Sequence, residues 1–120
     1  MAKHIETGKK GETLAANYLV TQGFSILETN WRNEHHEIDI IAKDGDELVI
    51  VEVKTLSSEY FGYPEKAVNK RKQNFLIDAA QAYVDQQNID LAVRYDVVSI
   101  FLKKNEHKIY HIKDAFTPGI

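Results

Sequence analysis

Charged side chains interrupt two short apolar runs in the middle of the chain, and this arrangement is typical of a site that carries out chemistry. The first run is Glu37–Ala42 (Glu-Ile-Asp-Ile-Ile-Ala) and the second is Val49–Lys54 (Val-Ile-Val-Glu-Val-Lys). Charges within β-branched runs are costly to bury unless they are paired or bind a metal ion. Asp39, Glu52 and Lys54 are therefore the first candidates for site residues.

A hairpin would bring these three residues together. The Asp44-Gly45 pair between the runs is a strong signal for a two-residue hairpin turn. Because side chains alternate between the faces of a strand, Glu52 and Lys54 share one face. With Asp44-Gly45 at the turn, Asp39 pairs with Ile50 and lies one diagonal step from Glu52, roughly 7–8 Å away. A loop longer by two residues would place Asp39 directly opposite Glu52, whereas a one-residue slip would split the cluster.

The same alternation places Glu37 and Asp39 on one face of the first run and Ile38, Ile40 and Ala42 on the other. Two carboxylates on rigid strands form a hard-oxygen site suited to magnesium or manganese. Such an ion polarises a phosphoryl oxygen, and a neighbouring lysine stabilises charge on the phosphate. The cluster therefore indicates metal-dependent phosphodiester hydrolysis. The alternative is a solvent-facing hairpin whose charges form ordinary cross-strand ion pairs.

Composition predicts one globular domain over residues 1–120, with 43% hydrophobic and 28% charged residues. No apolar stretch is long enough to span a bilayer, and the first six residues lack the apolar core of a signal peptide. The absence of cysteine excludes disulfides and thiolate metal sites. We therefore expect a cytoplasmic protein without a membrane partner. The net charge of −3 counts mildly against non-specific nucleic-acid binding.

Hydrophobic periodicity predicts an α/β protein with the element order α-β-β-β-α-β-β, in which helices flank a mixed sheet. The predicted helices cover about residues 7–22, ended by Gly23 as a left-handed cap, and about residues 65–87. The predicted strands cover about residues 25–31, 38–43, 47–54, 95–102 and 109–112, and residues 55–64 are predicted to form a loop. The apolar stripes of the helices are Leu14, Ala15, Tyr18 and Leu19 in the first, and Val68, Phe75, Leu76, Ala79, Ala80, Tyr83 and Val84 in the second.

Charged residues on the two helices allow either a functional or a structural interpretation. Glu12 either belongs to the hairpin site or is an ordinary exposed glutamate that interacts favourably with the positive end of its own helix. A basic cluster near the start of the second helix either contacts phosphate or forms a solvated face. This cluster consists of Lys66, Lys70, Arg71 and Lys72.

Three further pairs of residues have simpler interpretations. Arg94 and Asp96 share a strand face and are predicted to form an ion pair that fixes the strand end. His35-His36 is predicted to be a solvated loop segment, since adjacent strand residues point to opposite faces. Phe61 and Tyr63, in the predicted loop, are open between core packing and stacking on a base.

A series of short motifs runs along nearly the whole chain. The motifs are Gly11-Glu12, Ala15-Ala16, Tyr18-Leu19, Glu37–Ala42, Val51–Thr55, Phe61-Gly62, Ala67-Val68, Lys72-Gln73, Arg94–Val98 and Ile112–Phe116. In this combination the chain resembles the YraN-like family of small bacterial proteins. There are two departures from the patterns of related proteins. No proline precedes Asp39 in the Glu37–Ala42 motif, and His36 occupies the position where the family usually has a glycine.

The resemblance implies a restriction-endonuclease-like fold of the PD-(D/E)xK superfamily, closest to archaeal Holliday-junction resolvases. It implies that Asp39, Glu52 and the main-chain carbonyl of Val53 bind magnesium or manganese. By the same resemblance Lys54 is the catalytic lysine, and Glu12 corresponds to the acidic residue in the first helix of the resolvases.

The implied function is that of a metal-dependent endonuclease acting on DNA, including branched or recombining DNA, and a homodimer follows by analogy with the resolvases. Lys70, Lys72 and Gln73 are predicted to contact the nucleic acid, and for Lys72 and Gln73 the alternative is a contact with the site itself. The alternative is a catalytically silent nucleic-acid-binding or assembly module that keeps the nuclease fold. Dependence on a metal ion separates these two functions.

Overall fold

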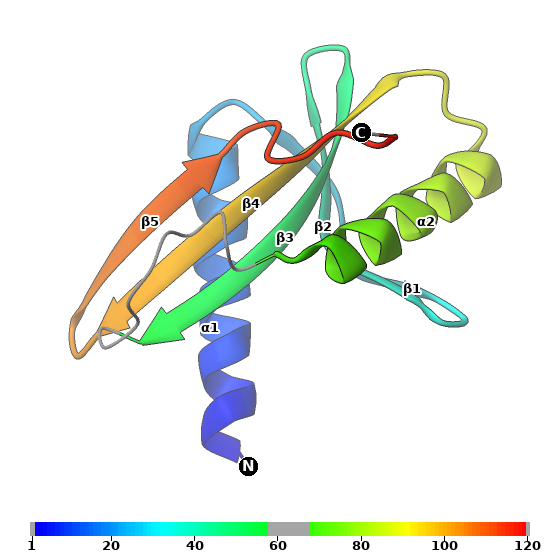
Figure 1. Ribbon diagram of the computed structural model, residues 1–120. Helices are drawn as coiled ribbons and strands as arrows, with labels where there is room; N and C mark the ends of the chain where they lie inside the picture. Colours follow the sequence, from blue (N-terminus) through cyan, green and yellow to red (C-terminus); the bar gives the residue numbers. More distant parts are fainter. Residues whose placement is uncertain (1, 58–67, 120) are drawn as a thin grey trace.

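The computed structural model of the chain describes residues 2–57 and 68–119. Within these residues two helices and five strands follow one another (Figure 1): α1 (Ala2–Thr21), β1 (Ser25–Asn33), β2 (His36–Asp44), β3 (Glu47–Ser57), α2 (Lys70–Gln87), β4 (Ala92–Lys103) and β5 (Glu106–Ile112). The predicted α/β class and element order are confirmed. The predictions for Phe61, Tyr63 and Lys66 lie outside the described residues.

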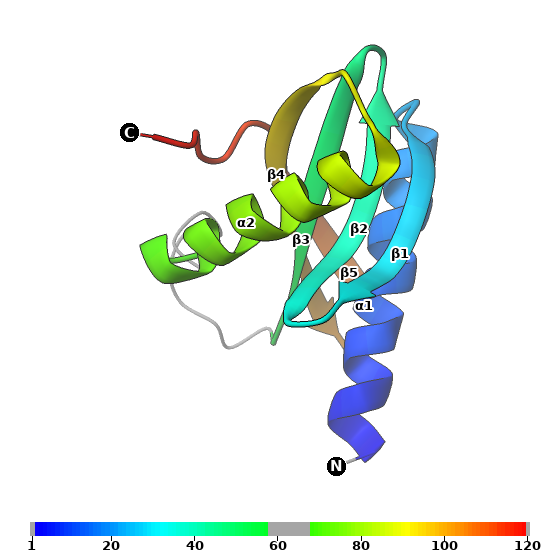
Figure 2. The same cartoon turned by 90° about the vertical axis from the view of Figure 1, so that its right-hand side faces the viewer.

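The five described strands form one mixed sheet in the order β1-β2-β3-β4-β5. β3 and β4 are parallel, whereas the other neighbouring pairs are antiparallel. Parallel neighbours need a long crossover connection, and here that connection includes α2. Figure 2 shows α1 and α2 against opposite faces of the sheet.

Each helix covers its own hydrophobic core. Leu48 and Ile50 of β3 pack with Leu76 of α2, whereas Val49 of β3 packs with Leu19 of α1. Alternate residues of β3 therefore enter opposite cores, as expected for a central strand covered on both faces. The stripe predicted for α2 is confirmed in its buried residues, which are Leu76, Ala79, Ala80 and Tyr83. Neither described helix is long and apolar enough to cross a membrane.

The ends of the elements differ from the predictions where local hydrogen bonds decide them. Gly23 ends α1 as predicted, with φ 92°, but α1 begins already at Ala2. α2 begins at Lys70 and not near residue 65, because Asn69 has an extended backbone and its side-chain oxygen accepts the amide hydrogen of Lys72 at 2.9 Å. Val68 therefore lies before the helix, although it is buried as predicted.

β3 extends three residues beyond its predicted end. It pairs with β4 along its full length, from Glu47 opposite Ala92 to Ser57 opposite Leu102. Residues 55–57, predicted to begin a loop, are therefore part of the strand. The partner strand supplies the hydrogen bonds that keep this segment extended.

The predicted Arg94–Asp96 ion pair is confirmed and is bidentate. Arg94 Nε and Nη2 lie 2.9 Å from the two Asp96 oxygens, and Arg94 Nη1 lies 3.0 Å from both Asp44 Oδ2 and Glu47 Oε1. Burial favours a higher pKa for Asp96, but hydrogen bonds from His111 and Arg94 outweigh it and the pKa is lowered. Arg94 thus ties the start of β4 to the turn of the β2–β3 hairpin.

Candidate active site at the fork between β2 and β3

The turn of the β2–β3 hairpin lies one residue later than predicted. Asp44 pairs with Glu47, so Gly45 and Asp46 form the turn. Gly45 has φ 62°, a conformation that glycine adopts without steric cost and that is favoured at the first central position of a hairpin turn. The shift places Asp44 and Glu47 side by side, where Arg94 binds both.

The later turn changes the register around the predicted site. Ile40 pairs with Val51, and continuing this register by one residue places Asp39 opposite Glu52. The predicted pairing of Asp39 with Ile50 is therefore wrong. The cluster itself remains, because the register has shifted by two residues and two is the period of a strand.

The two strands separate just where the charged residues begin. Their ladder ends at Ile40 and Val51, beyond which β2 stays paired with β1 and β3 with β4. In this fork the backbone amide of Val53 donates a hydrogen bond of 2.8 Å to Asp39 Oδ2. The Asp39 carboxylate thus replaces the missing strand partner and is held beside β3.

The predicted alternation of side chains between the two faces of β2 is interrupted between Ile38 and Ile40. Ile40 lies in the core under α1 as its spacing requires, but Ile38 packs with Ile41 in the core under α2. The interruption coincides with a local irregularity of the neighbouring strand β1. Asn30 of β1, which the register places opposite Asp39, has φ 51°. Asp39 therefore lies at the point where the regular alternation of side chains along β2 is broken.

Glu52 is the buried centre of the cluster, with 5% of its surface exposed. Its Oε2 lies 3.5 Å from Lys54 Nζ on the same strand and 3.6 Å from Lys72 Nζ on α2. Burial and the neighbouring Asp39 carboxylate raise the pKa of Glu52 to about 7, and the two lysines only partly oppose this. The arrangement therefore disfavours two negative charges unless a further cation is present.

Glu12 approaches the fork from α1. The residue before it, Gly11, packs so closely on β3 that a Cβ there would overlap Thr55 Oγ1. Burial raises the pKa of Glu12, a hydrogen bond with Asn30 opposes this, and the charge of Asp39 adds to it. Glu12 is therefore within electrostatic reach of the hairpin site, as predicted, but lies on its α1 side.

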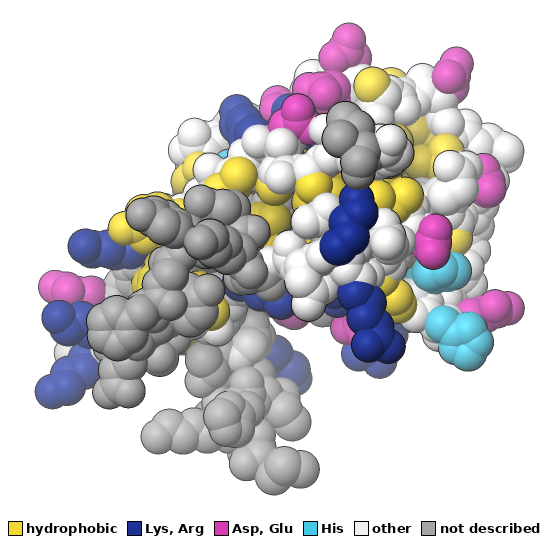
Figure 3. Space-filling view, viewed as in Figure 1, with side chains coloured by type: hydrophobic (Ala, Val, Ile, Leu, Met, Phe, Trp, Pro, Cys, Tyr) yellow, Lys and Arg dark blue, Asp and Glu magenta, His cyan; other side chains and the backbone are white. Residues whose placement is uncertain are grey.

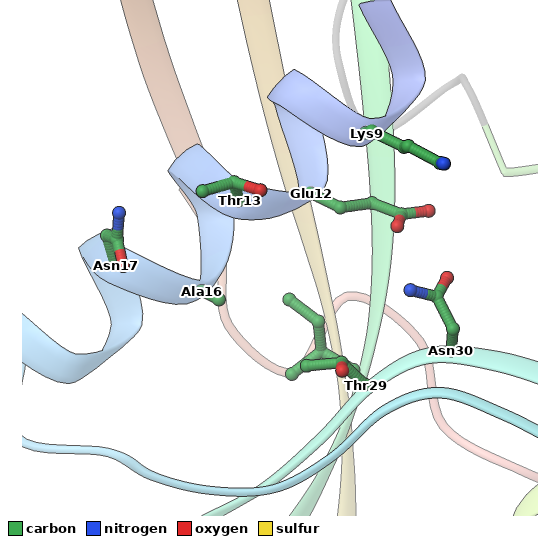
Figure 4. A pocket seen from close by; sticks show the side chains of 8 residues that line it. Lys9, Glu12, Thr13, Ala16, Asn17, Thr29 and Asn30 are labelled. Atoms are coloured by element: carbon green, nitrogen blue, oxygen red, sulfur yellow. The ribbon is translucent and has the colours of Figure 1, made fainter. Parts of the chain in front are cut away.

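A cleft of about 320 Å³ adjoins Glu12 between α1 and strands β1 and β2. In Figure 4, Lys9, Glu12 and Asn30 point toward one another at its edge. Its lining consists of Lys9, Glu12, Thr13, Ala16, Asn17, Thr29, Asn30 and Ile40. Side chains that can form hydrogen bonds thus extend from Glu12 along one side of α1.

The predicted nucleic-acid contacts have different surroundings. Lys70 and Arg71 are exposed in the first turn of α2, and Figure 3 shows Lys and Arg side chains near this end of the helix. Lys72 is turned toward Glu52. The amide of Gln73 donates to the carbonyl of Val68 at 3.2 Å, which is a helix-end contact.

One part of this arrangement was missed by the sequence analysis, and another was left open. Asn30 was not considered, although an asparagine within a predicted strand is disfavoured and marks an irregularity. Lys72 was predicted to contact either the substrate or the site, and its side chain lies beside Glu52 of the site. No local pattern indicates this contact, because it depends on how α2 packs against β3.

The ligands that the fork offers to a divalent cation are a pair of carboxylates. No three His, Asp or Glu side chains within the described residues form a ready-made metal site. Magnesium, however, is often bound through one or two carboxylates, with water and phosphate oxygens completing its shell. Asp39 and Glu52 provide such a pair.

Comparisons with known proteins give the family. Three similar relatives are UPF0102 proteins from Parabacteroides distasonis, Flavobacterium psychrophilum and Thermodesulfovibrio yellowstonii, which are 47%, 46% and 49% identical to this chain. The alignments cover 97%, 97% and 93% of this chain and 96%, 98% and 96% of the relatives. The model of the uncharacterised protein family UPF0102 matches residues 11–100, which include Glu12, the fork and α2. The chain therefore belongs to the UPF0102 family.

Proposed function

We propose that the protein is a metal-dependent endonuclease that hydrolyses phosphodiester bonds in DNA, with a site of the PD-(D/E)xK type. The observation that carries this proposal is the fork itself. Asp39 and Glu52 lie opposite each other where the strands separate, and the Lys54 ammonium is 3.5 Å from Glu52. Two carboxylates and a lysine on rigid strands are the groups that this chemistry needs.

Asp39 and Glu52 would hold a magnesium or manganese ion, with the carbonyl of Val53 as a further ligand. When bound, such an ion polarises a phosphoryl oxygen and lowers the pKa of water. The raised pKa of Glu52 supports this assignment, because a buried pair of carboxylates is stabilised by added positive charge. Val53 is placed well for this role, since its amide already holds Asp39.

Lys54 would stabilise the negative charge that builds up on the phosphate as water attacks. It projects from the same face of β3 as Glu52, and pairing with β4 fixes the strand at this point. Glu12 would complete the site from α1, directly or through a water molecule. Burial and the nearby charge of Asp39 raise the pKa of Glu12, and this favours a carboxyl group that can take up a proton.

A cleavage assay tests this function. Wild type, Lys54→Ala and Lys43→Ala would be incubated with linear duplex, single-stranded and branched DNA, each with magnesium, manganese or EDTA. Lys43 is an exposed lysine on the other strand of the hairpin and serves as the matched control. We expect metal-dependent cleavage by wild type and Lys43→Ala, and a loss on the order of 10²–10³ in rate for Lys54→Ala.

Two results would reject this function. Equal cleavage by wild type and Lys54→Ala would place the activity elsewhere or in a contaminant. Binding of DNA by wild type, without cleavage under any divalent ion, would replace the endonuclease with a nucleic-acid-binding or assembly module. The comparison of DNA forms also tests whether branched DNA is the preferred substrate. We further propose a cytoplasmic homodimer, which size-exclusion chromatography with light scattering would test for its oligomeric state.

A further inference from the structure

We propose that Lys72 is a counter-ion that leaves Glu52 when a divalent cation binds there, and that its ammonium then binds the phosphate of the substrate. This inference rests on the proposed function and assigns the coupling between metal and DNA binding at the same site. It gives Lys72 a role at the centre of the fork as well as on the DNA-binding surface.

Both ammonium groups converge on one oxygen of Glu52. Lys72 Nζ lies 3.6 Å and Lys54 Nζ 3.5 Å from Oε2. These distances exceed those of ordinary charged hydrogen bonds, so the contacts are electrostatic and not tightly fixed. A divalent cation bound through Glu52 would compete with the lysines for the same buried negative charge.

Lys72 is the better placed of the two to move. It belongs to α2, not to the strand that carries Glu52, and 38% of its side chain is exposed. Its ammonium also lies 5.0 Å from the centre of the Phe75 ring, a distance at which a cation–π contact is favourable. The Phe75 ring would therefore hold the Lys72 ammonium beside the site after the ammonium has left Glu52.

Formal charges explain why this exchange would favour substrate. With both carboxylates ionised, Asp39, Glu52, Lys54 and Lys72 sum to zero, and an ionised Glu12 would make the site negative, so without a cation the site does not attract an anion. A divalent cation adds two positive charges and leaves a positive surplus whether or not Glu12 is ionised. This surplus attracts the negative charge of a phosphodiester. Cation and DNA should therefore bind with positive coupling, and Lys72 supplies part of the surplus.

The test measures calcium binding by calorimetry for wild type, Lys72→Met, Lys72→Arg and Arg71→Met, with and without a short DNA duplex. Calcium is used alone as the probe ion, and the duplex is recovered and checked on a gel to be intact. Arg71 is the matched control, because it is an exposed cation on the same turn of α2. Methionine keeps the length of the lysine stem but removes the charge.

We expect Lys72→Met to bind calcium more tightly than Arg71→Met in the absence of DNA, by roughly fivefold or more, and to lose most of the calcium-dependent gain in DNA affinity. Lys72→Arg should behave like wild type in both measurements. Equal calcium affinity in Lys72→Met and Arg71→Met, or an unchanged gain in DNA affinity, would overturn the exchange while leaving the endonuclease proposal intact. Failure of wild type to bind calcium, both with and without the duplex, would instead reject the metal site itself.

Discussion

Replacing Glu52 by glutamine should stabilise the metal-free protein at neutral and alkaline pH. The pKa of Glu52 is raised from 4.5 to about 7 by burial and by Asp39. The difference of about 2.5 between these values, at about 1.4 kcal/mol per pKa unit, makes ionisation of Glu52 about 3–4 kcal/mol more costly in the folded protein than in the unfolded chain. Glutamine carries no charge and avoids this cost.

The direction of the pH dependence follows from the raised pKa. Below about pH 4.5 Glu52 is protonated in both states, so wild type and Glu52→Gln should be equally stable. Between pH 4.5 and 7 the unfolded chain loses the proton while the folded protein keeps it, and wild type becomes less stable than the variant as pH rises. Above about pH 7 the difference should level off at up to about 3–4 kcal/mol in favour of Glu52→Gln.

Urea unfolding followed by circular dichroism in EDTA, from pH 4.5 to 8.5, measures this difference. Glu106→Gln, an exposed substitution in β5, serves as the matched control and should follow wild type at every pH. Adding magnesium should then stabilise wild type by an amount that grows with the ion concentration, and leave Glu52→Gln unchanged.

A large loss of stability in Glu52→Gln at pH 8 would refute this reasoning. It would identify Glu52 as the anion that Lys54 and Lys72 require for folding, because breaking a buried ion pair is strongly destabilising. A stability difference between Glu52→Gln and wild type that stays the same at every pH would also refute the reasoning. It would show that the substitution does not act through the charge of Glu52.

Three further predictions concern the ligand pair and its supports. Asp39→Asn should lose most of the manganese binding measured by calorimetry, and equal binding by wild type and this variant would reject Asp39 as a ligand. Arg94→Met should lower the free energy of unfolding in urea by about 3–5 kcal/mol, because it leaves the buried Asp96 carboxylate without its bidentate partner; a loss below about 1 kcal/mol would mean that His111 alone suffices. Gly11→Ala should cost about 1–3 kcal/mol in the same measurement, since the new methyl group overlaps Thr55. The control Gly8→Ala should instead stabilise α1 by up to about 1 kcal/mol, because nothing lies near its Cβ; equal effects at both glycines would show that the contact with Thr55 relaxes freely.

Local patterns in the sequence were sufficient for the elements and for the carboxylate and lysine of β3. Glu52 and Lys54 are two residues apart, so strand geometry alone places them on one face. Arg94 and Asp96 follow the same rule, and their predicted ion pair is confirmed. The stripes of the helices were also predictable, because 3.6-residue periodicity is a property of the segment itself.

The register of the hairpin was decided by tertiary structure. Both Asp44-Gly45 and Gly45-Asp46 are acceptable turns from local sequence. Only in the second are Asp44 and Glu47 paired, and there Arg94, from a strand almost fifty residues later, binds both at 3.0 Å. A contact so distant in the chain leaves no periodic signal in the sequence of the hairpin.

The fork was likewise outside the reach of local patterns. It depends on where β2 leaves β3, and that depends on the partners of each strand in the rest of the sheet. The approach of Lys72 to Glu52 and of Glu12 to Asn30 follows from how α2 and α1 pack on the sheet's opposite faces. The sequence by itself thus determined which charges lie on β3. The tertiary structure decided which charges from other elements meet them, because electrostatic interaction depends on distance in space and not along the chain.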